Sequence, residues 1–306
     1  MKKLLILLLT GCLTPSPAYA QKQSTNTEIE LWPGVMPDAG GARGPEINNK
    51  GSITQVSKPR LIAHVPEHPN GIAMLVISGG GYAHIETGKE SSPAAEWLKA
   101  EGVTAFELIY RLPQEGWKTR LVPFEDAQRA MRIIRSQAKL YHIDPHKIGV
   151  LGFSAGGHLA GITATLPDKV FYPPVDDVDA TPSKPDFAAL IYPVISMLPP
   201  NDNTHSHKSI LGKEPSLEQE TAFSVERQVK TGMGPVFLAQ AADDPVASVE
   251  NSLLMFAALK KETVLSEMHI FQAGGHGWGM GKPGSAVSSW PQLFKKWLEC
   301  NGILNN

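Results

Sequence analysis

Short apolar runs recur along the chain, and stretches with apolar residues at helical spacing separate most of them. Runs that stay apolar on consecutive positions are typical of strands buried on both faces of a sheet. We predict strands at residues 61–65, 71–78, 103–108, 148–151, 187–192, 236–241 and 267–271. We predict helices at residues 94–100, from Pro123 to Ala138, after Gly156, at 249–261 and at 290–300. Strands that alternate with helices indicate an α/β fold with a mostly parallel central sheet and helices on both faces.

Three polar segments interrupt this alternation. Residues 21–58 are rich in Gly, Pro, Asn and Ser, and we predict an extended lead-in that lies on the domain. Residues 167–185 and 199–230 are predicted to be irregular insertions. Neither an internal repeat nor a domain-scale linker follows the lead-in, so residues 59–306 are expected to form one domain.

The first twenty residues have the pattern of a secretory signal peptide. Two lysines precede a mostly apolar run at 4–13, and Ala18-Tyr19-Ala20 fits the small-x-small rule for cleavage before Gln21. The alternative is lipoprotein processing, because Leu9-Thr-Gly-Cys12 resembles a lipobox that would place a lipid on Cys12. Both interpretations predict export to the periplasm or beyond the cell. After residue 20, no stretch is long and apolar enough to span a bilayer.

Composition excludes several classes of function. The 306 residues carry a formal charge of −2, which gives no sign of a nucleic-acid partner. Cleavage after Ala20 would leave Cys300 as the single cysteine, so neither a disulfide framework nor a cysteine-based metal site is expected. We expect no metal and no organic cofactor.

One predicted strand leads directly into Gly152-Phe-Ser-Ala-Gly156, a G-x-S-x-G pattern at the turn into a helix. Such an elbow is sharp and strained, and it holds the serine hydroxyl clear of the sheet above the helix N-terminus. An ordinary Gly-rich turn has the same pattern. Ser154 is therefore a candidate nucleophile whose case depends on partners elsewhere in the chain.

A serine nucleophile needs a base to take its proton and an acid to orient that base. His276 is the candidate base, because it sits in the Gly-rich turn 274–277 just after a late predicted strand. Asp243 and Asp244 follow another strand, and only one of these neighbours can direct its carboxylate at His276. We favour Asp244, which opens Asp-Pro-Val ahead of a helix, while Asp243 would cap or brace the loop. Serine, acid and histidine then follow the chain order of an α/β-hydrolase triad.

The remaining histidines near these motifs have simpler interpretations. His158 lies on the helix after the elbow and is interpreted as a packing residue or a contact at the helix start. His205 and His207 lie in a polar insertion, where solvated side chains are expected and a metal site is the alternative.

An oxyanion hole requires two backbone N–H groups. Ala155 follows the nucleophile and supplies one candidate. Gly80 and Gly81 belong to a three-glycine run after an early strand, the position of an HGGG-type loop, and supply the other. A tight turn or a phosphate-binding loop is the competing interpretation, but the run lacks the Lys-Ser/Thr of a P-loop.

Several segments match one known group in sequence and order. They are residues 77–82, 110–113, 125–130, 143–145, 152–160, 191–194, 243–246 with 249–252, and 274–277. Over roughly residues 61–306 the chain resembles secreted bacterial α/β-hydrolases of the esterase/lipase superfamily, in particular the acetylxylan esterase-like group. The resemblance implies acyl transfer by Ser154, Asp244 and His276, with Gly80, Gly81 and Ala155 as the oxyanion hole.

The resemblance implies a serine esterase for short acyl esters, with O-acetyl groups on xylan or a related plant polysaccharide as the expected substrate. Tyr82 and Trp278, with Tyr172 as a further candidate, are expected to line the acyl or sugar pocket. A feruloyl, aryl or general small-ester carboxylesterase is the alternative. A prolyl-oligopeptidase-like peptidase and a non-catalytic carbohydrate-binding module are weaker alternatives, because no propeller precedes the domain and both Ser154 and His276 are present.

Overall fold

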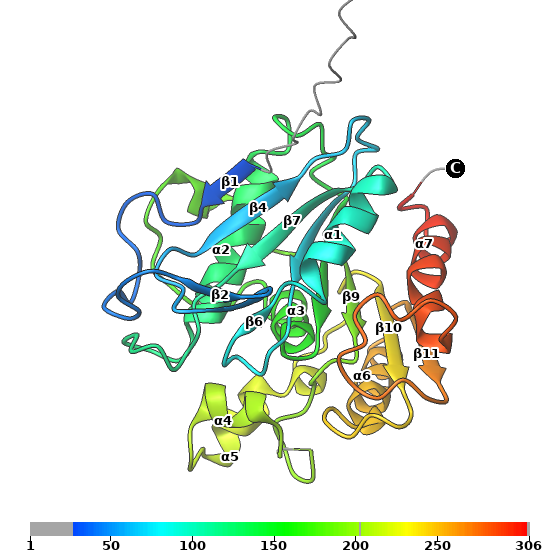
Figure 1. Cartoon of the computed structure of the whole chain (residues 1–306). Coiled ribbons are helices and arrows are strands. Elements are labelled where there is room, and N and C mark those ends of the chain that lie inside the picture. The colour runs from blue at the N-terminus through cyan, green and yellow to red at the C-terminus, as the bar shows by residue number, and fades with distance from the viewer. Residues whose placement is uncertain (1–26, 202, 305–306) are drawn as a thin grey trace, which may run out of the picture.

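An eight-stranded sheet forms the centre of the computed structural model, which describes residues 27–201 and 203–304 (Figure 1). The strands follow the order β1-β4-β7-β5-β8-β9-β10-β11. Pairing is antiparallel from β1 to β4 and from β4 to β7, and parallel from β7 to β11. The predicted signal peptide and Cys12 lie outside the described residues.

The element bounds follow the predicted alternation closely. The strands of the large sheet are β1 (Thr27–Glu30), β4 (Arg60–His64), β5 (Ala73–Ile77), β7 (Thr104–Ile109), β8 (Ile148–Phe153), β9 (Phe187–Ile191), β10 (Val236–Ala241) and β11 (Ser266–Phe271). The helices are α1 (Ser91–Ala100), α2 (Val122–Ser136), α3 (Ala155–Thr165), α4 (His205–Leu211), α5 (Leu217–Phe223), α6 (Val249–Lys261) and α7 (Trp290–Cys300).

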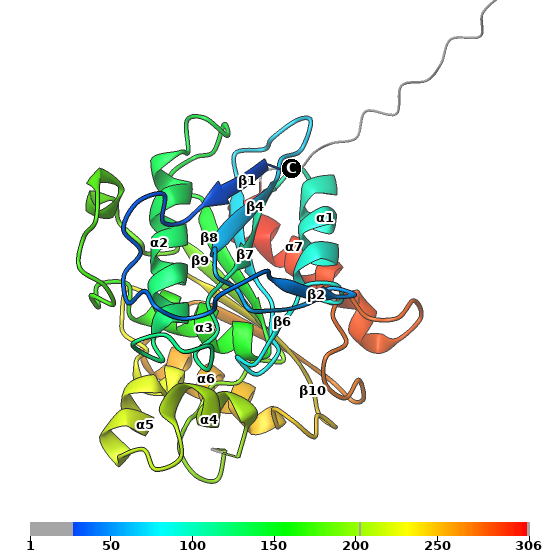
Figure 2. The same ribbon diagram turned by 60° about the vertical axis from the view of Figure 1, so that its left-hand side comes forward.

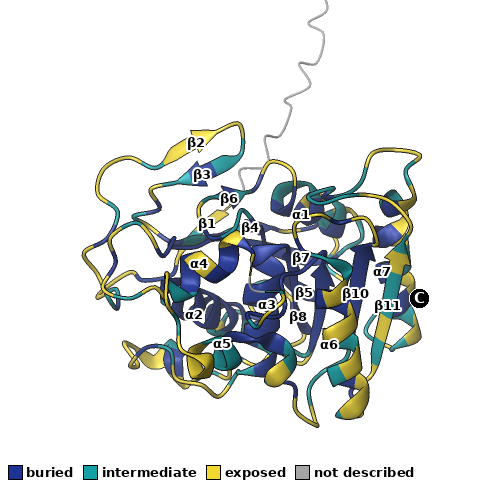
Figure 3. Cartoon of the chain, turned by 90° about the horizontal axis from the view of Figure 1, so that it is seen from below, coloured by how far each residue is buried: buried dark blue, intermediate teal, exposed yellow. Residues whose placement is uncertain are grey.

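Two apolar layers cover the sheet, one on each face. Alternate residues of β5 point to opposite faces: Leu75 belongs to the core with α2, α3 and α6, whereas Met74 belongs to the core with α1 and α7. Figure 2 shows α2 on one side of the strands and α1 and α7 on the other. Figure 3 shows the buried strands between these helical layers. The continuous apolar runs in the sequence follow from this burial on both faces.

The lead-in and the second insertion contain more regular structure than the sequence predicts. Residues 27–30 form β1 at the edge of the large sheet, and β2 (Ile47–Asn49) and β3 (Ser52–Thr54) pair with β6 (Ile85–Glu86) in a small second sheet. The insertion at 199–230 contains α4 and α5. Both helices are seven residues long, too short for a clear apolar period.

Buried charge attaches the lead-in to the domain. Arg111 follows β7 and is completely buried. Its guanidinium group donates to Asp126 at 2.7 Å, to Glu125 at 2.8 Å and to the carbonyl oxygen of Pro37 at 2.7 Å. Arg111 thus joins Pro37 of the lead-in to the two acids of α2, and its buried charge is both paired and hydrogen-bonded. Within the described ranges, no helix is long and apolar enough to cross a membrane.

Candidate active site

The turn between β8 and α3 has the strained geometry of a nucleophile elbow. Ser154 adopts φ 52° and ψ −117°, a conformation that non-glycine residues rarely take. A Cβ on Gly152 would lie 2.1 Å from the carbonyl oxygen of Gly156, so the close approach of strand and helix requires glycine there. Ser154 is 7% exposed and lines a cavity.

Three side chains from separate segments form one hydrogen-bonded chain. The Oγ atom of Ser154 lies 2.7 Å from Nε2 of His276, and Nδ1 of His276 lies 2.7 Å from Oδ2 of Asp244. An ionised carboxylate can only accept, so Nδ1 carries the proton and Nε2 is left to accept from the serine hydroxyl. The other oxygen of Asp244 accepts from the N–H groups of Val246 and Ala247, at 2.8 and 3.0 Å. The acid is thus held in one orientation toward the base.

Asp243 does not contact His276. Its Oδ1 accepts from the N–H groups of Gly274 and Gly275, both at 2.8 Å, and these bonds lower the pKa of Asp243. Asp243 therefore braces the turn that carries His276, while the buried Asp244 faces the imidazole. Of the two aspartates, Asp244 is the one hydrogen-bonded to His276, and its role as the orienting acid stays a prediction.

The candidate oxyanion groups surround the serine. Gly80 and Gly81 line the same cavity as Ser154 and adopt φ values of 113° and 63°. A Cβ on Gly80 would lie 2.2 Å from the carbonyl oxygen of His84, so the loop requires glycine at this position. Ala155 is the first residue of α3, where a backbone N–H has no partner inside the helix. These groups have the positions that the sequence predicts, and their part in stabilising an oxyanion stays a prediction.

The cavity in front of Ser154 has a volume of about 490 Å³. Val194 and Val246 provide its larger apolar side chains. Most of the other side chains around it are polar or charged, among them His84, Glu86, Lys89, Thr204 and His205. A cavity of this kind suits a small acyl group on a polar, hydroxyl-bearing leaving group.

The aromatic residues proposed for this pocket lie elsewhere, and these predictions are wrong. Tyr82 is completely buried, and its hydroxyl lies 2.8 Å from Nδ1 of His158. Trp278 packs against Tyr192, with ring centroids 4.5 Å apart. Tyr172 is buried beside Arg132 and Asp179. Each of the three aromatic side chains packs against other residues of the protein and does not line the cavity in front of Ser154.

The other histidines have structural partners. His158 is completely buried, its Nε2 lies 2.8 Å from the carbonyl oxygen of Phe223, and burial lowers its pKa to about 4. His207 lies 3.0 Å from Glu220. His205 lines the active-site cavity, which the sequence does not indicate. No group of three or more metal-ligating side chains occurs in the part of the chain that the structure describes.

Sequence reasoning also missed Glu90, a buried acid beside the site. One carboxylate oxygen accepts from the N–H of Gly79 at 2.6 Å, and the other accepts from the hydroxyl of Tyr192 at 3.0 Å. The ring of Tyr192 lies edge-on to His276, with centroids 5.0 Å apart. Glu90 therefore links the glycine loop to the ring that supports the base. A lone glutamate just before a predicted helix gives no sequence signal for such a role.

Burial raises the pKa of Glu90 to about 7, from 4.5 in the unfolded chain. The folded protein then binds more protons than the unfolded chain between these values, so the free energy of unfolding falls as pH rises through this window. We expect Glu90→Gln to remove roughly 1–3 kcal/mol of this pH dependence. Urea unfolding at pH 5 and pH 8 measures it. Glu67→Gln, at an exposed site, is the matched control and should retain the wild-type difference between the two pH values. If the free energy of unfolding of Glu90→Gln differed between pH 5 and pH 8 by as much as that of the wild-type protein, Glu90 would not be the source of the pH dependence.

Comparison with known proteins identifies the family. The model of the BD-FAE family matches residues 64–259. The chain belongs to the BD-FAE family. It is 31% identical over 239 residues to an acetylxylan esterase of Xylanibacter ruminicola, covering 75% of this chain and 46% of that protein. It is 37% identical over 225 residues to endo-1,4-beta-xylanase B of Butyrivibrio fibrisolvens, covering 72% of this chain and 34% of that protein. The chain thus spans less than half the length of either relative.

Solved structures agree with this family assignment. An acetyl ester-xyloside bifunctional hydrolase from Caldicellulosiruptor lactoaceticus matches with a TM-score of 0.80 and 34% identity, over 92% of this chain and 98% of that one. A propionate-bound esterase from Thermogutta terrifontis matches with a TM-score of 0.69 and 25% identity, over 81% of this chain and 92% of that one. The predicted α/β-hydrolase fold is confirmed, and the BD-FAE chain shares it over nearly its whole described length.

Proposed function

We propose that this BD-FAE protein is a serine esterase that hydrolyses short-chain acyl esters, with O-acetyl groups on xylan or a related plant polysaccharide as its substrates. The observation that carries the proposal is the hydrogen-bonded chain Asp244–His276–Ser154, whose serine faces a cavity of about 490 Å³. The relatives named for acetylxylan esterase and for acetyl ester-xyloside hydrolysis support the choice of substrate.

In the proposed mechanism, Ser154 Oγ attacks the ester carbonyl while Nε2 of His276 accepts its proton. The backbone N–H groups of Ala155 and of Gly80 or Gly81 stabilise the oxyanion. His276 then donates the proton to the departing sugar oxygen as the C–O ester bond breaks, which leaves an acyl-serine. Water, deprotonated by His276, attacks this acyl group and releases acetate and free Ser154. Asp244 stays ionised and orients the imidazole throughout.

The cavity lining supports a short acyl group. Val194 and Val246 offer little apolar surface, while an aromatic acyl group favours flat, apolar walls. Tyr82 and Trp278 would have supplied such walls, but Tyr82 is buried and Trp278 packs on Tyr192. The polar side chains that line the cavity are suited to the hydroxyl groups of a sugar.

Initial rates on four substrates test the substrate class: acetylated xylan, p-nitrophenyl acetate, p-nitrophenyl octanoate and methyl ferulate. We expect acetate release from xylan, and a higher kcat/KM for the acetyl than for the octanoyl ester. Ferulate release that exceeds acetate release would replace the acetyl proposal with a feruloyl one. Activity on p-nitrophenyl acetate without release from the polymer would retain the esterase and overturn the polysaccharide.

We further propose that the protein is exported through the sequence at residues 1–20. Expression in a bacterial host, followed by N-terminal sequencing of the mature protein, is expected to give Gln21 as the first residue. A mature protein that begins with a lipidated Cys12 would instead support lipoprotein processing and a membrane anchor. A cytoplasmic protein that retains Met1 would contradict export.

A further inference from the structure

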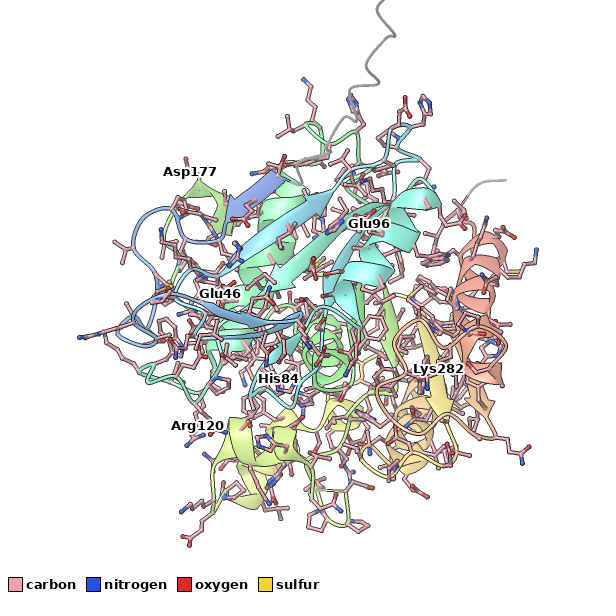
Figure 4. All side chains as sticks on the ribbon, in the orientation of Figure 1. Glu46, His84, Glu96, Arg120, Asp177 and Lys282 are labelled. Carbon is pink, nitrogen blue, oxygen red and sulfur yellow. The ribbon has the colours of Figure 1, made fainter. Side chains whose placement is uncertain are left out.

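A second cavity, of about 680 Å³, lies beside the active-site cavity. Three cationic side chains line it, and two histidines and two amide side chains complete most of its wall. Its lining includes Arg120, Lys208, Lys213, His205, His207 and Gln114, which we call the basic groove. Among the described residues, none of those that line it is acidic. In Figure 4, Arg120 lies beside α4 at the same end of the molecule as His84, which lines the active-site cavity.

The basic groove adjoins the proposed catalytic apparatus. His205 lines both cavities, and its Nδ1 lies 3.1 Å from the carbonyl oxygen of Gly81 in the glycine loop. The same Nδ1 lies 3.1 Å from Oγ of Ser209, which in turn accepts from Nε2 of Gln114 at 3.0 Å. These bonds connect the wall of the groove to the loop beside Ser154. A substrate that extends from the serine toward α4 would therefore enter the groove.

Among the residues that the structure describes, the three cations of the groove have no carboxylate partner. Arg120 donates from Nη1 to the carbonyl oxygen of Ser209 at 2.9 Å, which fixes its guanidinium group at the wall. Within residues 27–201 and 203–304, neither Arg120 nor the two lysines of the groove form an ion pair. In this wall, Glu220 accepts a hydrogen bond from Nε2 of His207 at 3.0 Å. A chain with a net charge of −2 thus gathers unpaired cations beside its active-site cavity.

We propose that the basic groove binds a carboxylate-bearing sugar unit of the polysaccharide, next to the unit that carries the acyl ester. This inference rests on the proposed esterase function and narrows its substrate to an acidic, uronate-substituted polymer. Arg120 is suited to hold a carboxylate through its planar guanidinium, and Lys208 and Lys213 add attraction at the exposed edge. Because these groups are exposed to solvent, the attraction is modest and weakens with salt.

A pair of acetylated xylo-oligosaccharides tests the groove. One carries a glucuronic acid side group, and the other carries glucose at the same position, so the two differ by the carboxylate. We expect the wild-type kcat/KM to be roughly three- to tenfold higher for the acidic substrate at low salt, with the preference lost near 1 M NaCl. In the triple variant Arg120→Gln/Lys208→Gln/Lys213→Gln, the ratio of the two kcat/KM values should fall to about one.

A second triple variant separates the groove from net charge. Lys139→Gln/Lys260→Gln/Lys261→Gln removes the same charge from exposed sites on other elements and should retain the wild-type ratio. Equal kcat/KM values of the wild-type protein on both substrates, with Ser154-dependent acetate release intact, would overturn the groove and leave the esterase. A preference that both triple variants lose equally would also overturn it. Absence of acetate release from either substrate would overturn the acetyl esterase proposal, and the groove with it.

Discussion

Replacement of Ser154 by alanine is expected to lower kcat on p-nitrophenyl acetate by roughly 10⁴- to 10⁶-fold. The substitution removes only the hydroxyl group, whose oxygen Oγ lies 2.7 Å from Nε2 of His276. Without it no acyl-enzyme forms, and only substrate binding and the oxyanion groups remain to assist water. Stopped assays with purified protein and a blank for spontaneous hydrolysis measure the loss.

The control for this variant is its fold. Alanine keeps the Cβ of serine and meets the same backbone strain at φ 52°, so the free energy of unfolding measured in urea should stay within about 1 kcal/mol of the wild-type value. His276→Ala should show a loss of similar size, because the two residues act as one unit. Near-wild-type turnover in folded Ser154→Ala protein would refute the nucleophile assignment.

The second large effect separates two neighbouring aspartates. Asp244→Asn is expected to lower kcat by about 10⁴-fold, because an amide in place of the carboxylate favours the wrong tautomer of the imidazole 2.7 Å away. KM should change little, since Asp244 is buried behind the histidine and does not line the cavity. Steady-state kinetics on p-nitrophenyl acetate separate the two parameters.

Asp243→Asn is the matched comparison, one residue away and with the same chemical change. Its amide oxygen can still accept from the N–H groups of Gly274 and Gly275, so we expect a loss of less than about tenfold. Equal losses in the two variants would indicate that the loop acts as a unit and that Asp244 has no special relation to His276. A larger loss in Asp243→Asn would reverse the assignment.

The sequence predicted the parts of the site whose chemistry restricts residue type. The elbow needs small residues around Ser154, and the clash at Gly152 shows the steric reason in the structure. Asp244 was favoured because it opens a short turn that leads into a helix, and α6 begins five residues later. In the structure, the N–H groups of Val246 and Ala247 in that turn donate to the carboxylate of Asp244. The strands were predictable because burial on both faces leaves few polar positions.

The remaining parts depend on contacts between distant segments. Tyr82 lies next to the glycine loop in sequence, but its ring turns inward to meet His158, 76 residues later. Glu90 meets Tyr192 across 102 residues, and no periodic pattern marks either residue. The basic groove combines the loop after β7 with α4, in an insertion whose polar composition predicted irregular structure. A single sequence carries no signal for such pairings.

Covalent labelling tests the central claim most directly. An organophosphate that carries a reporter group phosphorylates an activated serine, and peptide mass spectrometry locates the adduct. We predict one adduct per molecule on Ser154, formed in step with the loss of esterase activity, and no adduct in His276→Ala protein over the same time. Complete inactivation with the label on another residue, or an active enzyme that resists labelling, would contradict a mechanism in which His276 activates Ser154.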